Sequence, residues 1–426
     1  MNIQKALDKG KGKVSIKGWV YRIRKGKNLI FIIIRDTNNL VQCIVEKEKV
    51  SEQIWQDADK LQVESAIEID GDIQEDKRAA TGYEIKTSKL NIVHLAENFP
   101  IGKDQSDDLL LDMRHLALRT RKLTSTLKIR STVMGALHNI IREKGYIEVE
   151  APTFNATTSE GGSSTFEVKY YGKKAYLTQS WQFYAENIIN AFEKAYTMAP
   201  SFRAEKSRTS RHLTEFWHFE IEAAWATVQD MLKISEDCII GTINQVIKDN
   251  KQELKVLGID IKELEKVKAP FPTITYKAAI ERLQKKGYKI KYGEDFGAKE
   301  EKYLAKEYKG NFLAVTNYPL EILKFYHGED PKMPGTGMNF NILAPGIGEV
   351  LDSSQREPDL GKIQERLKKA KVDLSHSDWY LDSRRYGSVP HAGFGLGTER
   401  LIQWICKLET IKDAIPFPRT PTRIKP

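Results

Sequence analysis

Five short runs in which apolar and polar residues alternate lie between residue 13 and about residue 95, with turn residues between them. Alternation with a period of two is typical of strands that bury one face. A helical stretch near residues 51–60 separates the third run from the fourth. Five strands with one helix at that point predict a closed barrel of the OB-fold type, which often binds single-stranded nucleic acid. The runs cover residues 14–23, 29–36, 40–45, 66–73 and 83–93.

The pattern changes after a polar connector, residues 96–115, in which few apolar positions recur. Residues 123–144 place apolar side chains at helical spacing, and Gly145 suits the end of that helix. Residues 145–152 then predict a strand that ends at a proline. The connector therefore separates an all-β domain from a second domain that mixes helices and strands.

The second domain continues with two strands, residues 195–198 and 219–223, on either side of a polar loop. Residues 227–265 predict amphipathic helices, and residues 275–310 predict a mixed αβ insertion with a charged, solvated surface. We therefore expect an α+β protein. Its predicted parts are an OB-fold domain (1–95), a connector (96–115) and a larger domain (116–426) with an insertion around 227–310.

Composition adds limits on the location and partners of the protein. No apolar run reaches the roughly 18 residues of a membrane helix, and the first residues lack the apolar core of a signal peptide. The three cysteines, Cys43, Cys238 and Cys406, are too scattered for a zinc site and fit a reducing cytoplasm. The net charge of +9 suits a polyanionic partner without identifying it.

The loop between residues 198 and 219 is dense in positive charge. Arginine suits phosphate because its planar guanidinium can donate to two oxygens at once. Glu205 and the neighbouring aromatic residues add groups that fit a base and a ribose. On the residues alone, a nucleotide site and an exposed basic hairpin that contacts the RNA backbone both stay open. The cations are Arg203, Lys206, Arg208, Arg211 and His212.

Three segments, in order, resemble the signature motifs of the class II aminoacyl-tRNA synthetases, specifically the aspartate/asparagine subgroup. Residues 202–216 read F-R-x-E and then R-H-L-x-E-F, as in motif 2. Residues 392–400 read A-G-F-G-L-G-T-E-R, which resembles the G-x-G-x-G-x-E-R of motif 3. The helix, strand and proline up to Pro152 resemble motif 1, which builds the dimer interface in this class. The resemblance covers most of the chain.

This resemblance implies an antiparallel sheet flanked by helices, together with the N-terminal OB-fold barrel. It implies a ligase that activates an amino acid with ATP and transfers it to the 3′-hydroxyl of the terminal adenosine of a tRNA. Activation brings two anions together, so the site must align them and neutralise charge. The implied partners are ATP, Mg2+, tRNA and a second copy of the chain.

The motif matches also imply roles for single residues. Arg203 would hold the α-phosphate and the amino-acid carboxylate, and Arg400 would clamp the γ-phosphate and one adenine face. Glu349 would carry Mg2+, a cation that prefers oxygen ligands, and we expect Asp352 to share it. Arg203, Glu349 and Arg400 are thus the implied catalytic residues. The implied ATP-binding residues are Arg203, Glu205, Arg211, His212, Leu213, Phe216, Glu349, Gly397 and Arg400.

The identity of the amino acid depends on two matched positions. Aspartate-specific members carry a lysine three residues after the glutamine that matches Gln182, and here that position is Ala185. They also carry an aspartate downstream of motif 2, and here that position is Glu220. A pocket without this lysine compensates a side-chain carboxylate poorly, so neutral asparagine is favoured over aspartate. The implied amino-acid-binding residues are Glu160, Gln182, Arg203, Glu220, Tyr326, Asp352 and Arg356.

The N-terminal segment resembles the anticodon-binding domain of the same subgroup. By that match Phe31 would stack on an anticodon base and Gln42 would hydrogen-bond the central uridine. Arg22 belongs to a basic rim beside them. From the residues alone, filling of the barrel core is the favoured interpretation of Phe31.

Three positions depart from the subgroup pattern. Asn341 stands where an aspartate is usual, Asp352 where a glycine or serine is usual, and Leu323 where a lysine is usual. We therefore expect that one metal ligand has moved from position 341 to position 352. Three alternatives stay open: an aspartate-specific member, a relative that forms asparagine without tRNA, and a non-catalytic tRNA-binding paralogue.

Overall fold

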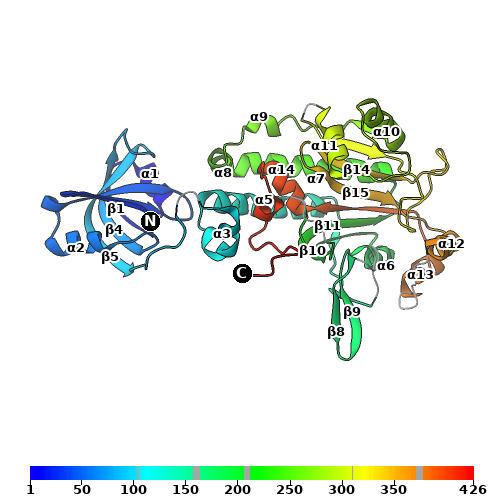
Figure 1. Ribbon diagram of the computed structural model, residues 1–426, viewed down its shortest axis with the longest axis horizontal. Helices are drawn as coiled ribbons and strands as arrows, with labels where there is room; N and C mark the ends of the chain where they lie inside the picture. Colours follow the sequence, from blue (N-terminus) through cyan, green and yellow to red (C-terminus); the bar gives the residue numbers. More distant parts are fainter. Residues whose placement is uncertain (103–104, 157–163, 206–211, 309, 371–377) are drawn as a thin grey trace. The chain divides into compact units, whose positions relative to one another are not determined.

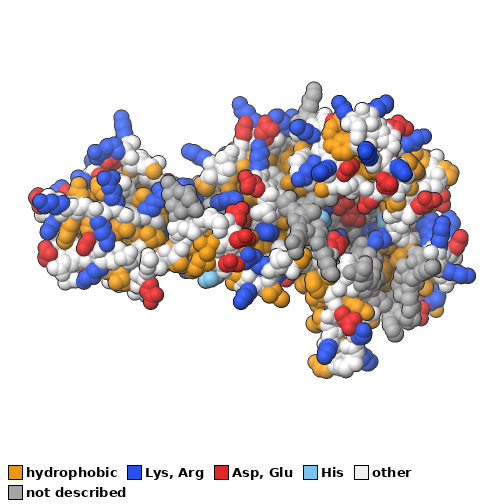
Figure 2. All heavy atoms as spheres, viewed as in Figure 1, with side chains coloured by type: hydrophobic (Ala, Val, Ile, Leu, Met, Phe, Trp, Pro, Cys, Tyr) orange, Lys and Arg blue, Asp and Glu red, His pale blue; other side chains and the backbone are white. Residues whose placement is uncertain are grey.

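The computed structural model describes residues 1–102, 105–156, 164–205, 212–308, 310–370 and 378–426. The chain forms two compact units, Met1–Leu110 and Leu111–Pro426 (Figure 1). None of the helices in the described ranges has the length and hydrophobicity needed to cross a membrane. On the visible face of each unit, lysine and arginine side chains are interspersed with aspartate and glutamate (Figure 2). The positive net charge is therefore not gathered into one patch on that face.

The first unit contains the predicted barrel, which closes in the strand order β1-β2-β3-β5-β4. Alternation along β2 buries Ile30, Ile32 and Ile34 in the barrel core and leaves Phe31 half-buried on the outer face. The expectation of five strands with one helix between the third and fourth is confirmed. The elements are α1 (Ile3–Lys9), β1 (Gly12–Lys25), β2 (Leu29–Arg35), β3 (Leu40–Glu46), η1 (Lys47–Lys49), α2 (Glu52–Lys60), β4 (Ala66–Glu75) and β5 (Tyr83–His94).

The second unit is built on an eight-stranded sheet in the order β12-β13-β14-β15-β16-β11-β10-β6. Neighbouring strands are antiparallel except for β12 with β13 and β10 with β6 at the two edges. This confirms the expected antiparallel sheet flanked by helices. The strands are β6 (Ile147–Glu148), β10 (Lys194–Phe202), β11 (Glu215–Ala224), β12 (Thr273–Thr275), β13 (Leu313–Thr316), β14 (Asn339–Ala344), β15 (Gly348–Gln355) and β16 (His391–Gly397).

A long helix, α5 (Arg121–Glu143), packs its apolar face into the core of this sheet. Its first turn is capped by the Thr120 hydroxyl, which accepts from the backbone N–H of Leu123. The chain leaves the helix through Gly145, whose φ of 83° is the left-handed conformation that glycine adopts without strain. The predicted helix is thus present. The predicted strand over residues 145–152 is much shorter, because only β6 pairs with a neighbour.

A small sheet of β7 (Phe154–Asn155), β8 (Glu167–Tyr170) and β9 (Lys173–Leu177) includes a hairpin that projects from the unit (Figure 1). The remaining helical elements are α3 (Asp107–Asp112), α4 (Arg114–Ala117), α6 (Gln182–Phe192), α7 (Val228–Asp249), α8 (Lys251–Val256), α9 (Ile261–Leu264), α10 (Tyr276–Lys285), α11 (Ala298–Lys306), α12 (Leu360–Ala370), α13 (Asp378–Arg385), α14 (Thr398–Ile405) and η3 (Ile411–Ala414).

The predicted insertion around residues 227–310 needs a correction. Helix α7 buries Met231, Cys238 and Ile243 in the same core as the main sheet, so this part is integral to the domain. Only α10 and α11 pack into a separate cluster, at the β12–β13 end of the sheet. Amphipathic spacing shows that a helix has a buried face, but it does not reveal which surface covers that face.

Candidate functional site

The hairpin of β10 and β11 carries the basic loop. Arg203 directly follows β10, and its backbone N–H donates to the carbonyl of Thr214 (3.0 Å). The Arg203 guanidinium carbon lies 5.4 Å from the centre of the Phe216 ring, which is within the range of a cation–π contact. The hairpin therefore presents a cation and an aromatic face side by side. Lys206, Arg208 and Arg211 lie outside the described residues.

The segment from β16 into α14 supplies a second cation to the same place. Glu399 is 1% exposed and accepts from Arg130 (2.7 Å) and from the backbone N–H of Trp217 (3.0 Å). Arg400 instead donates to the backbone carbonyl (2.8 Å) and carboxylate (3.1 Å) of Glu349. Successive helical residues point about 100° apart. Glu399 is therefore held by buried partners at the base of the site, whereas Arg400 faces the open site.

These elements enclose a pocket, which we call the nucleotide pocket. Eight of the nine residues expected to bind ATP line it, and the ninth, Arg211, lies outside the described residues. Sequence reasoning did not include seven further lining residues. The expected ones are Arg203, Glu205, His212, Leu213, Phe216, Glu349, Gly397 and Arg400, and the additional ones besides Asp352 are Thr214, His218, Val350, Gly395, Glu399, Ile411 and Pro421.

A smaller pocket, which we call the amino-acid pocket, adjoins the first. The two share Arg203, His218, Asp352 and Gly395. A ligand group in one pocket would therefore meet a ligand group in the other beside the Arg203 guanidinium. The remaining lining residues are Ser180, Trp181, Gln182, Glu220, Ile221, Glu222, Arg356 and Phe394.

Two of the seven expected amino-acid-binding residues are not found in this lining. Tyr326 is buried and lies under Arg356, with the guanidinium carbon 5.6 Å from its ring centre. It therefore supports Arg356, whereas the resemblance implied that it would line the pocket. Its place in the chain could not reveal this, because the contact joins residues from different elements. Glu160 lies outside the described residues.

Glu220 is held rigidly at the back of the amino-acid pocket. The hydroxyl of Ser180 donates to one carboxylate oxygen, and the backbone N–H of Trp181 donates to the other (2.9 Å). Since these donors come from the turn before α6, the carboxylate is satisfied on the protein side. The pocket therefore contains a fixed negative charge.

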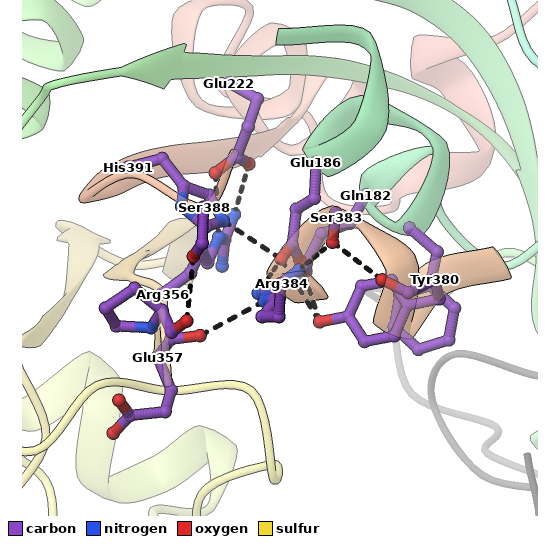
Figure 3. A network of polar contacts seen from close by, with 12 residues as sticks. Gln182, Glu186, Glu222, Arg356, Glu357, Tyr380, Ser383, Arg384, Ser388 and His391 are labelled. Carbon is purple, nitrogen blue, oxygen red and sulfur yellow. Dashed lines mark hydrogen bonds and ion pairs between the residues drawn. The ribbon is translucent and has the colours of Figure 1, made fainter. Parts of the chain in front are cut away.

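Arg356 is held on the other wall by two buried partners (Figure 3). Its Nε and Nη2 donate to the two oxygens of Glu222 (3.1 and 2.9 Å), and its Nη1 donates to the hydroxyl of Ser354 (2.7 Å). A guanidinium has five N–H groups. Within the described residues these contacts use three of them, so one N–H group on Nη1 and one on Nη2 remain for a ligand.

Burial sets the charge of two neighbouring groups. Burial lowers the pKa of His218 well below its usual range, and the cations Arg203 and Arg400 add to the shift. His218 is therefore neutral near pH 7. Burial raises the pKa of Glu222, while the Arg356 guanidinium opposes that shift.

Two carboxylates, Glu349 and Asp352, face the nucleotide pocket from β15. The β14–β15 register shifts by one residue, which places Glu349 opposite Leu343 and Asp352 opposite Asn341. Directly opposed residues share a face of the sheet. Glu349, Asp352 and Asn341 therefore point to one side, and Asn341 Nδ2 donates to Glu349 Oε2 (2.7 Å). Among the described residues, no group of three or more histidine, cysteine or acidic side chains could hold a metal by itself.

The charged segment around α11 also reaches this strand. Glu301 is 7% exposed, and its Oε2 accepts from the backbone N–H of Glu349 (3.0 Å). The expectation of a purely solvated surface for residues 275–310 is therefore wrong at this residue. Charge alone could not distinguish Glu301 from the exposed glutamates around it.

The barrel carries a separate hollow on its outer face. Strand pairing aligns Arg22, Ile33, Gln42 and Glu84 in one row across β1, β2, β3 and β5. A second row beside it contains Arg24, Phe31, Ile44 and Lys86. All eight side chains line the hollow, so the three expected anticodon residues, Arg22, Phe31 and Gln42, lie together.

Sequence reasoning missed the acidic side of this hollow. Glu84 is 3% exposed and accepts from Gln74 Nε2 (3.0 Å), and Asp76 pairs with Arg78 (2.8 Å). Glu84 comes next to Gln42 only because β3 and β5 pair in parallel. That pairing is not local in the sequence, so alternation alone could not reveal it.

Family comparisons agree with both units. Residues 106–421 match the family model described as tRNA synthetases class II (D, K and N). Residues 14–93 match the family model described as an OB-fold nucleic acid binding domain. Together the two matched ranges cover nearly the whole chain.

Individual relatives agree as well. The asparagine–tRNA ligase of Thermoplasma acidophilum is 45% identical over 415 residues, 97% of this chain and 96% of the relative. The crystal structure of asparaginyl-tRNA synthetase from Pyrococcus horikoshii complexed with asparaginyl-adenylate superposes with a TM-score of 0.96 at 40% identity, covering 100% and 99% of the two chains. An aspartyl tRNA synthetase from Entamoeba histolytica gives a TM-score of 0.87 at 26% identity, covering 100% of this chain and 92% of that one. The chain therefore belongs to the class II tRNA synthetases of the D, K and N group.

Proposed function

We propose that this chain is an asparagine–tRNA ligase, which activates asparagine with ATP and transfers it to the terminal adenosine of tRNA(Asn). The observation that carries the proposal is the junction of the two pockets at Arg203. Membership of the class II family and the asparagine–tRNA ligases among the relatives support it. This activity needs ATP and asparagine to be held side by side, and the two adjoining pockets can hold them in that way.

In the first step the asparagine carboxylate attacks the α-phosphorus of ATP, and the bond from that phosphorus to pyrophosphate breaks. Arg203 is placed to neutralise the charge that builds up where the two anions meet. Phe216 offers a face for the adenine ring, and Arg400 offers a cation for the far phosphates. The two pockets hold the reactants and align them, so no side chain needs to act as nucleophile.

In the amino-acid pocket we assign the asparagine side chain to Glu220 and Arg356. A carboxylate accepts from an amide N–H, and the remaining N–H groups of Arg356 donate to an amide oxygen. Aspartate would place a second negative charge near Glu220 with no added cation, because position 185 is an alanine. Leaving that charge uncompensated in a buried site is unfavourable.

We further propose that Glu349 and Asp352 hold the Mg2+ that accompanies ATP. Their oxygen donors fit the ion, which commonly takes one or two carboxylates together with substrate phosphates. Asp352 lies directly across the strand pair from Asn341, so a carboxylate at 352 takes the place of one at 341 on the same face. When bound, the ion would supply positive charge to the phosphates.

Removing the carboxylate at position 352 tests this assignment. We expect Asp352→Asn to raise the Mg2+ concentration for half-maximal ATP–pyrophosphate exchange by about tenfold. A variant with both Asn341→Asp and Asp352→Asn returns the carboxylate to the opposite strand and should restore the original dependence. An unchanged Mg2+ dependence in Asp352→Asn would contradict the role of Asp352.

For tRNA, we propose that the barrel hollow takes anticodon bases. Phe31 supplies a stacking surface, Gln42 and Glu84 supply hydrogen-bonding groups, and Arg22 supplies charge for the backbone. The family match of this segment to an OB-fold nucleic acid binding domain supports the assignment. The strands that line the hollow would therefore contact the RNA with residues far in sequence from the reacting groups.

We also propose a homodimer formed through α5 and β6. Strand β6 is the edge of the eight-stranded sheet, and Ile147 in it is 47% exposed. An apolar residue on an open edge favours pairing with another chain. Light scattering should give a dimer for the wild type and a monomer for Ile147→Lys, and a wild-type monomer would contradict the proposal.

We place the enzyme in the cytoplasm. Its cysteines, Cys43, Cys238 and Cys406, are buried and free, which is the state that a reducing compartment maintains. The tRNA and ATP that it uses are present there.

The direct test of the function is ATP–pyrophosphate exchange with purified protein and Mg2+, comparing asparagine with aspartate. Exchange with asparagine alone is the expected result. Exchange with aspartate alone would identify an aspartyl enzyme, and tight tRNA binding without exchange would identify a binding paralogue.

A further inference from the structure

A buried carboxylate with no role in the proposed activation step lies behind the amino-acid pocket. Glu186 sits one helical turn after Gln182 on α6, and its side chain is fully buried. Figure 3 shows it among Gln182, Arg384, His391 and Tyr380. Its partners come from α13 and from the start of β16, about 200 residues later in the chain.

The two oxygens of Glu186 share one partner and differ in the others. Oε1 accepts from Gln182 Nε2 (2.9 Å) and, at 3.3 Å, from the hydroxyl of Tyr380. Oε2 accepts from Arg384, from His391 Nε2 (3.1 Å) and from the hydroxyl of Tyr380 (3.1 Å). Burial by itself raises the pKa of Glu186, but Arg384 and His391 outweigh it and lower the pKa overall. Glu186 is therefore ionised and can only accept hydrogen bonds.

An ionised Glu186 decides which way the Gln182 amide points. A side-chain amide carries a donating nitrogen and an accepting oxygen, and its surroundings select the orientation. Since Glu186 only accepts, the Gln182 nitrogen must face it. The Gln182 oxygen is then left for the pocket that the residue lines. An accepting oxygen there suits the N–H groups of an ammonium ion.

His391 strengthens this arrangement. Its Nδ1 faces the backbone carbonyl of Val389 (2.7 Å), and its Nε2 faces Glu186 (3.1 Å). The ring is therefore fixed between the Val389 carbonyl and Glu186. Arg384 binds the same carboxylate oxygen, so Glu186 is held in place with Oε1 at hydrogen-bonding distance from Gln182.

We propose that Glu186 is a positioning residue for the amino-acid pocket, because it keeps the Gln182 oxygen turned toward the α-ammonium group of the bound amino acid. The proposal rests on the assignment of this pocket to the amino acid. It adds a residue that has no contact with the pocket itself and acts through Gln182. Loss of this positioning should weaken amino-acid binding and leave ATP binding unchanged.

A double-mutant cycle on Glu186 and Gln182 tests the proposal. Glu186→Asp keeps the negative charge between Arg384 and His391, but it withdraws the carboxylate from Gln182 by one methylene. We expect it to raise the dissociation constant of asparagine, measured by calorimetry, about tenfold. In a Gln182→Met background, the same Glu186→Asp change should have less than a twofold effect. The KM for ATP in pyrophosphate exchange should stay within twofold in all variants.

Tyr380→Phe is the matched control, since it removes a different donor from the same carboxylate and leaves Gln182 in place. Asparagine binding in this variant should stay within about threefold of the wild type. A Glu186→Asp effect that is equally large in the Gln182→Met background would overturn the proposal, because Glu186 would then not act through Gln182. A parallel rise in the KM for ATP would overturn it as well, since that indicates general damage.

Failure of the proposed function would look different. If the wild type binds and activates aspartate in place of asparagine, the asparagine assignment fails, and the same cycle is measured with aspartate. The α-ammonium group is common to both amino acids, so the expected nonadditivity is the same. If the effects of the Glu186 and Gln182 changes are additive for the amino acid that the wild type binds, the proposed role of Glu186 is overturned and the proposed function is not.

Discussion

The nucleotide pocket and the amino-acid pocket adjoin and share Arg203, yet they compensate their charges in different ways. In the nucleotide pocket the cations Arg203 and Arg400 line the space that a ligand would fill, and Arg400 also pairs with Glu349. In the amino-acid pocket Arg356 and Glu220 are held by buried neighbours, as in the Arg356–Glu222 pair. Only a few donors and acceptors are left over for the ligand.

The difference separates two kinds of recognition. A pocket with accessible cations attracts any polyanion of suitable size, and the affinity depends on total charge. A pocket whose charges are already paired discriminates by the pattern of its remaining hydrogen-bonding groups, because a mismatched ligand leaves buried groups without partners. Class II chemistry needs both, since ATP is abundant and distinctive whereas asparagine and aspartate differ by one group.

The largest expected effect comes from the residue that the pockets share. Arg203→Ala should reduce ATP–pyrophosphate exchange about a thousandfold, because it removes the cation at the point where both anions meet. Arg385→Ala, which removes an exposed arginine paired with Asp382, serves as a control and should retain full exchange. Retention of more than a tenth of the activity in a folded Arg203→Ala variant would mean that the pockets do not meet there.

A smaller effect is expected from a substitution in the amino-acid pocket. Glu220→Gln removes the fixed negative charge, so the preference for asparagine over aspartate should fall about a hundredfold. The measurement is the ratio of kcat/KM for the two amino acids in exchange. Equal losses for both amino acids would show that Glu220 contributes binding without discrimination.

A buried histidine, His327, should also make the free energy of unfolding depend on pH. Burial and the nearby Arg356 lower the pKa of His327 to about 3. In the unfolded chain histidine titrates near 6.5, so below that pH the unfolded state binds a proton that the folded state does not. The free energy of unfolding therefore falls as pH falls from about 6.5 toward about 3.

Replacing this histidine isolates its contribution. Between pH 7 and pH 5 the wild type should lose about 2 kcal/mol more stability than His327→Gln. The measurement is urea unfolding of the full chain, followed through the transition of the second unit, Leu111–Pro426. Both asparagine and ATP are left out of these samples, so that ligand binding does not mask the difference in stability. If both proteins lose the same stability, His327 is not buried as a neutral ring.

The smallest effect on amino-acid activation is expected from a substitution in the barrel. Phe31→Ala should leave ATP–pyrophosphate exchange unchanged while lowering kcat/KM for tRNA in aminoacylation about tenfold, since one stacked base loses its partner. The matched change Leu29→Ala removes an apolar residue from the same hollow without an aromatic face, and a milder effect is expected. A drop in exchange in Phe31→Ala would mean that the hollow influences the chemistry of activation.

Most residues that line the nucleotide pocket could be predicted because their arrangement is local. Arg203 and Phe216 belong to one hairpin, and the β16–α14 junction brings Arg400 to its pocket within a few residues. Glu349 and Asp352 lie three residues apart on β15. Residue type and spacing alone left a basic RNA-binding hairpin equally open, and it was the resemblance to the class II motifs, each carried by one short segment, that predicted these members of the nucleotide pocket.

Tertiary structure decided the rest, for a physical reason. A charge can be buried only where partners from elsewhere in the fold compensate it, and those partners are invisible in a local pattern. Glu186 meets Arg384 and His391 across about 200 residues, Glu84 meets Gln42 through a parallel strand pairing, and Tyr326 lies beneath Arg356. Sequence alone thus determined the two domains, the strand and helix pattern and the ligand-facing cations, whereas packing between distant segments determined which side chains hold those groups in place.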